Sequence, residues 1–403
     1  MKLPVLFILI TLMLDAIGIG LIMPVMPDLI REVEGGDLAQ AAVWGGILST
    51  VFAVMQFTFG PIIGGLSDRF GRRPVLLISL LVMAVDYVIM AVAGTIWLLL
   101  VGRIVGGITA ATHSTAAAFM ADISEPEKKA QNFGLVSAAF GVGFVLGPMI
   151  GGLLSTFGPR APFIAAAIIA GANFVLGYFV LTETVTDRIR RPFEWKRANP
   201  FGALVSVARL PGLRALLFVY FLYQLAFYVY PAVWAYFTQE NFGWSPVMVG
   251  YSLAAFGISM AISQGFLIRW VIPKFGERKT VLIGFVIDIV AFGLTGILTN
   301  GWVVLCIAPL SAIGAMATPA LQGILSRAAS DDQQGELQGL LTSINALAMI
   351  LSPIVMTQAF AYFSGASAPI YLPGAPFLLS MLLMIAAIGI YMSIYRKVTE
   401  AIT

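Results

Sequence analysis

Long apolar segments recur along the whole chain, and they constrain its fold more than any other feature. Of the 403 residues, 59% are hydrophobic and only 11% are charged, whereas soluble domains carry roughly 25% charged residues. A helix needs about 20 apolar residues to cross a bilayer. Twelve such segments can be marked: 4–27, 43–66, 75–94, 96–120, 132–156, 163–182, 213–237, 247–268, 281–298, 302–326, 339–363 and 375–395. They lack the apolar–polar alternation of a membrane β-barrel, so the sequence predicts an all-α membrane protein with twelve transmembrane helices.

The Lys and Arg residues predict the orientation of these helices. If both termini are cytoplasmic, the loops on the cytoplasmic side receive 20 of the 23 Lys and Arg residues. The outer side receives Arg31 and Arg160, and Arg103 lies within an apolar segment. Cytoplasmic loops normally carry this excess of positive charge, so we expect both ends of the chain on the inner side of the membrane.

The two halves of the chain resemble each other. Phe70-Gly71 and Phe275-Gly276 are 205 residues apart, as are Trp97 and Trp302. The longest polar stretch, 183–212, lies between six apolar segments and six more. We therefore expect a six-helix bundle at 1–182, a cytoplasmic loop at 183–212 and a second bundle at 213–403. Parallel halves of this kind are typical of transporters, whose substrate site lies between the repeats near the bilayer midplane.

Four charged residues interrupt the apolar segments: Asp15, Asp86, Arg103 and Asp288. A charge at that depth is costly and indicates a functional site by default. A carboxyl that is neutral when occluded and ionised when wet can carry one proton per transport cycle, and a fixed cation beside it would let substrate and proton compete. The alternative is that these acids are structural, paired with Arg103 or packed at helix contacts.

The only histidine, His113, lies in the fourth apolar segment. Histidine titrates near neutral pH and would suit a proton relay. A lone histidine that is hydrogen-bonded at a helix contact is the alternative.

Neutral amides also lie within the apolar segments: Gln56, Asn173, Gln224 and Gln264. Inside a membrane such amides either hydrogen-bond neighbouring helices or donate to a polar substrate in a cavity. Met260 and Gln264 are one helical turn apart and share a face. These five residues are the candidates for substrate binding.

Two further patterns suggest moving parts. Gly143, Gly147 and Gly151 form a stripe without side chains that favours close helix approach, and Pro148 predicts a kink. The polar loop after the second segment contains Asp68, Arg69, Gly71, Arg72 and Arg73, and Asp122 is a candidate partner at the end of the fourth segment. We expect this loop to act as a latch that stabilises the outward-facing state; the alternative is a loop whose charges only set topology.

These motifs resemble the major facilitator superfamily. The loop Gly64–Pro74 is similar to its cytoplasmic signature, and Gly143–Gly152 is similar to the motif of its antiporters. Within the superfamily, the sequence resembles the tetracycline/proton antiporter family. The stretches that carry this second resemblance are Leu14–Pro24, Asp86-Tyr87, Gly102-Arg103, Phe242–Trp244, Met248–Ala254 and Pro319–Gly323.

The resemblance implies a drug exporter with the two-bundle fold. It implies that tetracycline leaves as a complex with a divalent metal such as Mg²⁺, in exchange for protons, with Asp15, Asp86 and Asp288 important for coupling and with Gln56 and Gln264 in the cavity. Met260 occupies the position at which several members carry His, four residues before the Gln, and His113 stands where a small residue is expected. A drug or metabolite other than tetracycline is therefore an alternative substrate.

Several classes are disfavoured. The basic residues are scattered over short loops, which predicts no nucleic-acid partner, and no P-loop for ATP appears. One His and the lone Cys306, set in an apolar stretch, leave no nucleophile–base pair and no metal site. We expect no bound cofactor and no enzyme activity, but a monomer in the lipid bilayer of a bacterial inner membrane. A non-transporting membrane receptor remains the rival of another class.

Overall fold

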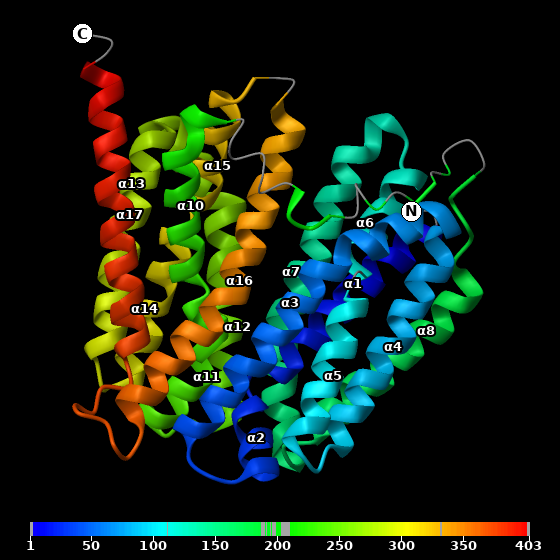
Figure 1. Ribbon diagram of the computed structural model, residues 1–403, viewed down its shortest axis with the longest axis horizontal. Helices are drawn as coiled ribbons and strands as arrows, with labels where there is room; N and C mark the ends of the chain where they lie inside the picture. The colour runs from blue at the N-terminus through cyan, green and yellow to red at the C-terminus, as the bar shows by residue number, and fades with distance from the viewer. Residues whose placement is uncertain are drawn as a thin grey trace. The chain divides into compact units, whose positions relative to one another are not determined.

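The computed structural model describes residues 3–110, 112–186, 190, 192–193, 195, 199–202, 210–330 and 333–400, and within them it is helical with no strand (Figure 1). The helices before the central loop are α1 Leu3–Ile22, α2 Met26–Glu34, α3 Leu38–Phe70, α4 Arg72–Val92, α5 Ile96–Thr109, α6 Thr112–Ile123, α7 Lys129–Leu154 and α8 Ala161–Val180. The helices after it are α10 Arg214–Phe227, α11 Val229–Phe242, α12 Pro246–Ile262, α13 Ile268–Ile297, α14 Gly301–Gly314, α15 Ala317–Ala328, α16 Gln334–Ser364 and α17 Ala375–Glu400. Short 3₁₀ turns cover Pro126–Lys128 (η1), Ser155–Phe157 (η2) and Pro211–Leu213 (η4), and a π turn, η5, covers Ser263–Leu267.

Eleven helical stretches among the described residues are long and apolar enough to cross a membrane. One of them, Pro246–Ile297, has 52 residues, and at 1.5 Å per residue it is about twice as long as one crossing needs. Its backbone leaves the helical conformation at Gly276, where φ is +72°. This stretch therefore supplies two crossings, which agrees with the twelve predicted from the sequence.

Four of the predicted segments are not continuous helices. The first breaks at 23–25, the fourth at Ala110, the seventh at Tyr228 and the tenth at 315–316. Three of these breaks have the same cause: Pro27, Pro231 and Pro319 each follow a break by two to four residues. Proline lacks an N–H for the carbonyl four residues before it, and its ring clashes with that carbonyl.

The fourth break has a different solution. The next proline after Ala110 is Pro126, sixteen residues later, but the Gln56 amide of α3 donates a hydrogen bond to the Ala110 carbonyl at 3.3 Å. A side chain from a neighbouring helix thus satisfies a carbonyl that α5 leaves without a helical partner.

The chain forms two compact units. The first contains residues 1–36, 51–200 and 244–254, and the second contains 37–50, 201–243 and 255–403. The boundaries differ from a simple cut at the central loop because the first turns of α3 belong to the second unit and most of α12 belongs to the first.

In the first unit the glycine stripe of α7 faces the backbone of α1. A methyl group on Gly143, Gly147 or Gly151 would collide with the carbonyl oxygens of Met13, Ile17 and Leu21, respectively. Bare backbone at these positions lets the two helices approach closely, which replaces the hydrophobic driving force that is missing between helices in lipid.

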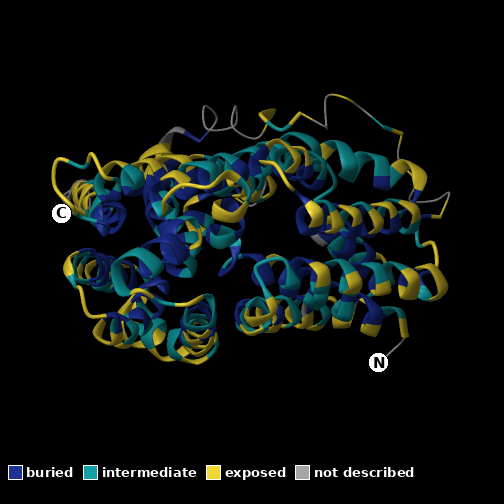
Figure 2. Cartoon of the chain, turned by 90° about the horizontal axis from the view of Figure 1, so that it is seen from below, coloured by how far each residue is buried: buried dark blue, intermediate teal, exposed yellow. Residues whose placement is uncertain are grey.

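In the second unit, α10 and α13 both pack against α17, and an aromatic cluster fills the space between α11 and its neighbours. Tyr230, Trp234 and Phe237 of α11 all pack on the ring of Phe377 from α17. Exposed residues run along other helix faces (Figure 2). Several are large and apolar, such as Ile168 and Phe179 of α8, as expected for side chains that face lipid. Cys306 of α14 is also exposed, so its apolar surroundings do not bury it.

A methyl group on the glycine stripe of α7 should loosen the packing of α7 against α1. We expect Gly147→Ala to lower the free energy of unfolding of the protein in detergent by about 1–3 kcal/mol, because the added carbon would lie 2.7 Å from the Ile17 carbonyl oxygen and overpacking costs about that much. Gly141→Ala on the same helix is the matched control, because nothing lies within 4 Å of its added methyl group. Equal melting temperatures for the two variants would contradict the assignment.

Candidate functional site

An ion pair joins α4 and α5 inside the first unit. An Nη of Arg103 donates a hydrogen bond to one carboxylate oxygen of Asp86. The same nitrogen lies 2.6 Å from the Met90 sulfur, and the guanidinium centre lies 5.1 Å from the centroid of the Phe52 ring. Asp86 is 3% exposed. Arg103 therefore pairs with one of the intramembrane acids, as the sequence suggested, and an aromatic face covers it.

Glycines on α5 make room for this carboxylate. A methyl group on Gly102 or Gly106 would lie 2.8 Å and 2.6 Å, respectively, from an Asp86 oxygen. The second oxygen, Oδ1, is buried and has no hydrogen-bond partner among the described residues. The pair is thus only half satisfied.

Asp15 of α1 belongs to the same neighbourhood and is 7% exposed. Tyr87 of α4 interacts electrostatically with Asp15, Asp86 and Arg103, and its hydroxyl approaches the backbone of α1 at Gly18. Three of the predicted coupling residues are therefore gathered around one buried phenol. Sequence reasoning named Tyr87 only within the Asp86-Tyr87 match to the family and gave it no role; its position beside an intramembrane acid was the available signal.

Asp288 of α13 has a different environment in the second unit. It is 0% exposed, and both of its carboxylate oxygens lack a hydrogen-bond partner among the described residues. It lies beside Tyr223 of α10 and against Gly314, where any side chain would collide with the carboxylate. Gly314 ends α14 immediately before the break at 315–316. An ionised Asp288 would have no compensating charge in the described part of the chain. Burying the ionised carboxylate there costs much more free energy than burying the neutral acid.

Three of the predicted amides contact other helices. The Gln56 amide caps the break at Ala110, as described above. Asn173 of α8 is 1% exposed and accepts a hydrogen bond from the Thr11 hydroxyl at 3.2 Å. Gln224 of α10 donates to the Asn345 side chain of α16. These contacts are of the inter-helix kind.

Met260 and Gln264 lie differently. Met260 is half-buried at the end of α12, and Gln264 is exposed in the π turn that follows. His113 lies in α6, but its side chain is outside the described residues. No group of three or more His, Cys, Asp or Glu side chains in the described chain is placed to hold a metal ion.

The polar loop after α3 is held by Arg72. Its guanidinium contacts Asp68 at 2.5 Å, Asp122 of α6 at 3.2 Å and the Ser67 hydroxyl at 3.0 Å. Gly71 has a φ of +115°, a conformation that favours glycine. Arg69 stacks on Phe70. The structure thus brings Asp68, Arg72 and Asp122 together, and their role as a latch of the outward-facing state stays a prediction.

Glu183, which the sequence did not single out, fastens the same loop. One carboxylate oxygen accepts hydrogen bonds from the backbone N–H groups of Arg72, Thr184 and Val185 at 2.9 Å, and the other accepts from the N–H of Arg73 at 3.2 Å. The carboxylate therefore caps the N-terminus of α4, where negative charge is favourable. Arg73 in turn donates to the Tyr178 carbonyl at 2.8 Å. Only the fold brings position 183 beside position 72.

Removing the charge of Glu183 should weaken the latch. We expect Glu183→Gln to lower the free energy of unfolding by about 1 kcal/mol, because hydrogen bonds to a charged acceptor are stronger than those to a neutral one and this site is partly exposed. Thermal unfolding of the purified protein measures it. Glu127→Gln, an exposed residue of η1, is the control and should leave stability unchanged. An equal loss in both variants would refute the capping role.

The second unit repeats the Arg72–Asp122 pair with the charges exchanged. Glu277 and Arg327, each 205 residues beyond Arg72 and Asp122, form an ion pair between α13 and α15. Gly276 precedes Glu277 with a positive φ, as Gly71 precedes Arg72. The repeat therefore keeps the geometry of this contact and reverses its polarity.

The Glu277–Arg327 ion pair can be tested by exchanging the charges of its two residues. We expect Arg327→Glu, at a side chain that is 65% exposed, to lower the free energy of unfolding by up to about 1 kcal/mol, because it places two carboxylates together. Adding Glu277→Arg should restore most of the loss in a double-mutant cycle of thermal unfolding. A double variant that is no more stable than Arg327→Glu would contradict the pairing.

Comparison with known proteins places this arrangement in a family. The sequence matches the Major Facilitator Superfamily over residues 8–223 and 216–390. It is 43% identical to the class C tetracycline resistance protein of Escherichia coli over 87% of this chain and 88% of that protein. It is 42% identical to the class G tetracycline resistance protein of Vibrio anguillarum over 88% of this chain and 89% of that protein. The chain belongs to the major facilitator superfamily and to its tetracycline resistance family. It is a multi-pass membrane transporter rather than an enzyme, in agreement with the expectation from its sequence.

Solved structures agree with this assignment. The human organic anion transporter MFSD10 (TETRAN) superimposes with a TM-score of 0.69 and 26% identity over 96% of this chain and 99% of that one. A bacterial homologue of the human lysosomal transporter Spinster reaches a TM-score of 0.78 at 17% identity over 97% of this chain and 96% of that one, which indicates a shared fold alone.

Proposed function

We propose that the protein is a drug/proton antiporter that exports tetracycline, as a complex with a divalent metal ion such as Mg²⁺, from the bacterial cytoplasm. The observation that carries the substrate is the 42–43% identity to two tetracycline resistance proteins over nearly nine-tenths of the chain. In this proposal the protein is a monomer in the inner membrane with both termini cytoplasmic, because the excess of Lys and Arg lies in the loops on that side.

The burial of the acids supports proton coupling. Asp288 lies beside the Tyr223 hydroxyl but faces no cation among the described residues, so its occluded form is the protonated one. Opening its surroundings to water lets the carboxyl ionise and release the proton. Protonation and occlusion are thereby linked, which is what exchange requires. Asp15, which is 7% exposed, is the second proton-carrying candidate.

The Asp86–Arg103 pair has another role in this proposal. Arginine stays protonated in proteins, so it gives Asp86 a permanent counter-charge in the closed pair. Oδ1 of Asp86 is left without a hydrogen-bond partner among the described residues. A cationic metal–drug complex that reaches this oxygen would compete with Arg103 for the carboxylate. Met260 and Gln264 would line the drug path, Met260 being half-buried and Gln264 exposed one turn away.

The deciding experiment is tetracycline uptake into inverted membrane vesicles with Mg²⁺ and an imposed proton gradient. We expect gradient-dependent uptake that Asp288→Asn and Asp15→Asn reduce at least tenfold, because neither amide can carry the proton. Asp37→Asn is the control, since an asparagine oxygen can still accept the hydrogen bond from the Gln40 N–H at 2.8 Å. Full uptake in both Asn variants would overturn the coupling assignment.

A second substrate is favoured by one observation. Met260 gives this position an apolar, flexible side chain in place of the histidine of several relatives. If the vesicles move no tetracycline but release protons when other amphipathic drugs are added, the protein is a proton-coupled exporter of different specificity, and Met260→His should then alter the drug preference.

A further inference from the structure

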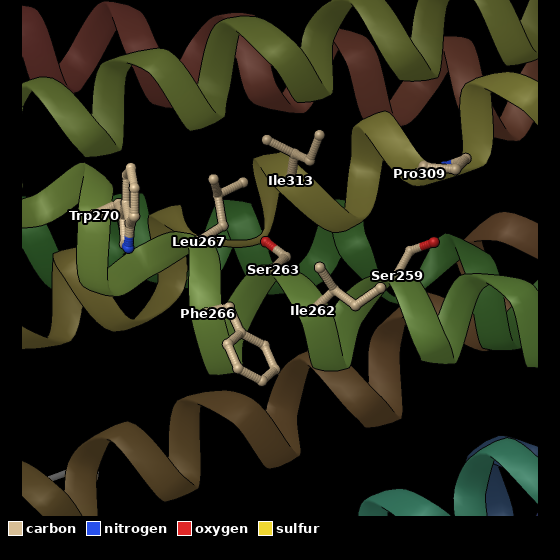
Figure 3. Close-up of a pocket in the computed structure, with 8 residues that line it drawn as sticks. All are labelled: Ser259, Ile262, Ser263, Phe266, Leu267, Trp270, Pro309 and Ile313. Atoms are coloured by element: carbon tan, nitrogen blue, oxygen red, sulfur yellow. The ribbon is translucent and has the colours of Figure 1, made fainter.

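The second unit contains a cavity that the proposed transport cycle does not use. Its volume is about 400 Å³, within the range of pockets that bind small molecules, about 300–1,000 Å³. Figure 3 shows the side chains of α12, η5, α13 and α14 that surround it. The lining residues are Ser259, Ile262, Ser263, Phe266, Leu267, Trp270, Pro309 and Ile313.

A π turn forms one wall of this cavity. Residues Ser263–Leu267 are wound as a π-helix, so the N–H of Ile268 bonds the Ser263 carbonyl, five residues before it. Single π turns inside α-helices are rare and occur frequently at functional sites. Here the turn lies between α12 and α13 and places Ser263, Phe266 and Leu267 on the cavity.

Ser263 carries the only hydroxyl of the lining that lacks a partner among the described residues. It is 1% exposed, and its Oγ makes no hydrogen bond there. Ser259, one turn earlier, makes the usual hydrogen bond of a helical serine, to the Ala255 carbonyl at 2.9 Å. In Figure 3 the Ser263 oxygen points away from its own helix, toward Leu267 and Ile313. A buried hydroxyl without a partner is rare enough to require an explanation.

The rest of the lining defines what a partner must be. None of the lining residues is charged, so an ionic ligand would find no counter-charge. Phe266 and Trp270 are 72% and 82% exposed and offer two aromatic surfaces, while Pro309 and Ile313 of α14 form the opposite wall. An uncharged aromatic molecule with one hydrogen-bond acceptor fits this combination. A lipid chain would fill the apolar space but would leave the Ser263 hydroxyl unpaired.

The cavity is separate from the groups assigned to transport. Asp288, Met260 and Gln264 are not among its lining residues. Met260 and Gln264 lie on a different face of the same helix, because adjacent positions are turned by about 100°.

We propose that this cavity is a binding site for a neutral aromatic molecule with a carbonyl acceptor. The Ser263 hydroxyl donates a hydrogen bond to the carbonyl oxygen, and the aromatic body lies between Phe266, Trp270 and the wall of α14. The site does not depend on which drug the protein exports.

Benzophenone is a suitable probe, because it is a neutral diaryl ketone that inserts into nearby C–H bonds when irradiated. We expect saturable photolabelling of the purified protein in lipid nanodiscs, mapped by mass spectrometry to peptides that contain 259–270 and 309–313. Ser263→Ala should reduce this labelling at least fivefold. Ser259→Ala is the matched control, because its hydroxyl is already bonded within the helix. Melting temperatures of both variants identify any loss that comes from misfolding.

A competition experiment separates a ketone site from a lipid-filled groove. Excess 9-fluorenone, which has a carbonyl, should suppress the labelling, whereas fluorene, which has the same rings without it, should suppress it much less. Equal suppression by both, unchanged labelling in folded Ser263→Ala, or labelling spread over all lipid-facing helices would overturn the proposal. The readout is labelling rather than transport, so it is independent of the drug assay.

Discussion

The cost of placing polar groups in hydrocarbon is the constraint on which the rest of this structure depends. Every backbone N–H and C=O must find a partner inside the protein, so each crossing is a helix and each break needs a local solution. Three breaks precede prolines at 27, 231 and 319, which lack an N–H in any case. The fourth is relieved by the Gln56 amide, which donates to the Ala110 carbonyl at 3.3 Å. Gln56, a polar residue within the membrane, thus satisfies a backbone carbonyl rather than facing only a substrate cavity.

Between helices, the same solvent removes the usual reason for packing, because lipid is as apolar as leucine. Helices associate instead where their surfaces fit closely together. The glycine stripe of α7 lies against the carbonyls of α1, and glycines beside Asp86 and Asp288 make room for carboxyl groups rather than for another helix. Small residues therefore have two uses here: some bring backbones together, and others create the space in which an acid is buried.

The number of helices, their approximate limits and the repeat of two halves follow from the sequence, because apolar length is a local property. For Arg103 the sequence left two kinds of partner open, an intramembrane acid or a helix-end carbonyl, because a buried cation needs a negative or electron-rich partner; the structure pairs it with Asp86. Three of the four helix breaks are also encoded in the sequence, in prolines within otherwise apolar segments. In contrast, the capping role of Glu183 could not be predicted, because position 183 lies beside Arg72 and Arg73 only in the folded chain. The role of Asn173 depended on Thr11 lying opposite it, and the π turn at Ser263–Leu267 has no simple sequence signal.

The three intramembrane acids look alike in the sequence, but the structure separates them by their partners. Asp86 faces a permanent cation, so its charge can persist while it is buried, and it changes state only if that cation is displaced. Asp288 faces Tyr223, Gly314 and no cation among the described residues, so its charge can persist only when water reaches it. One acid is therefore suited to sense a positively charged substrate and the other to sense exposure to water. The proposed antiport needs both responses, and the two acids that would supply them lie in different units.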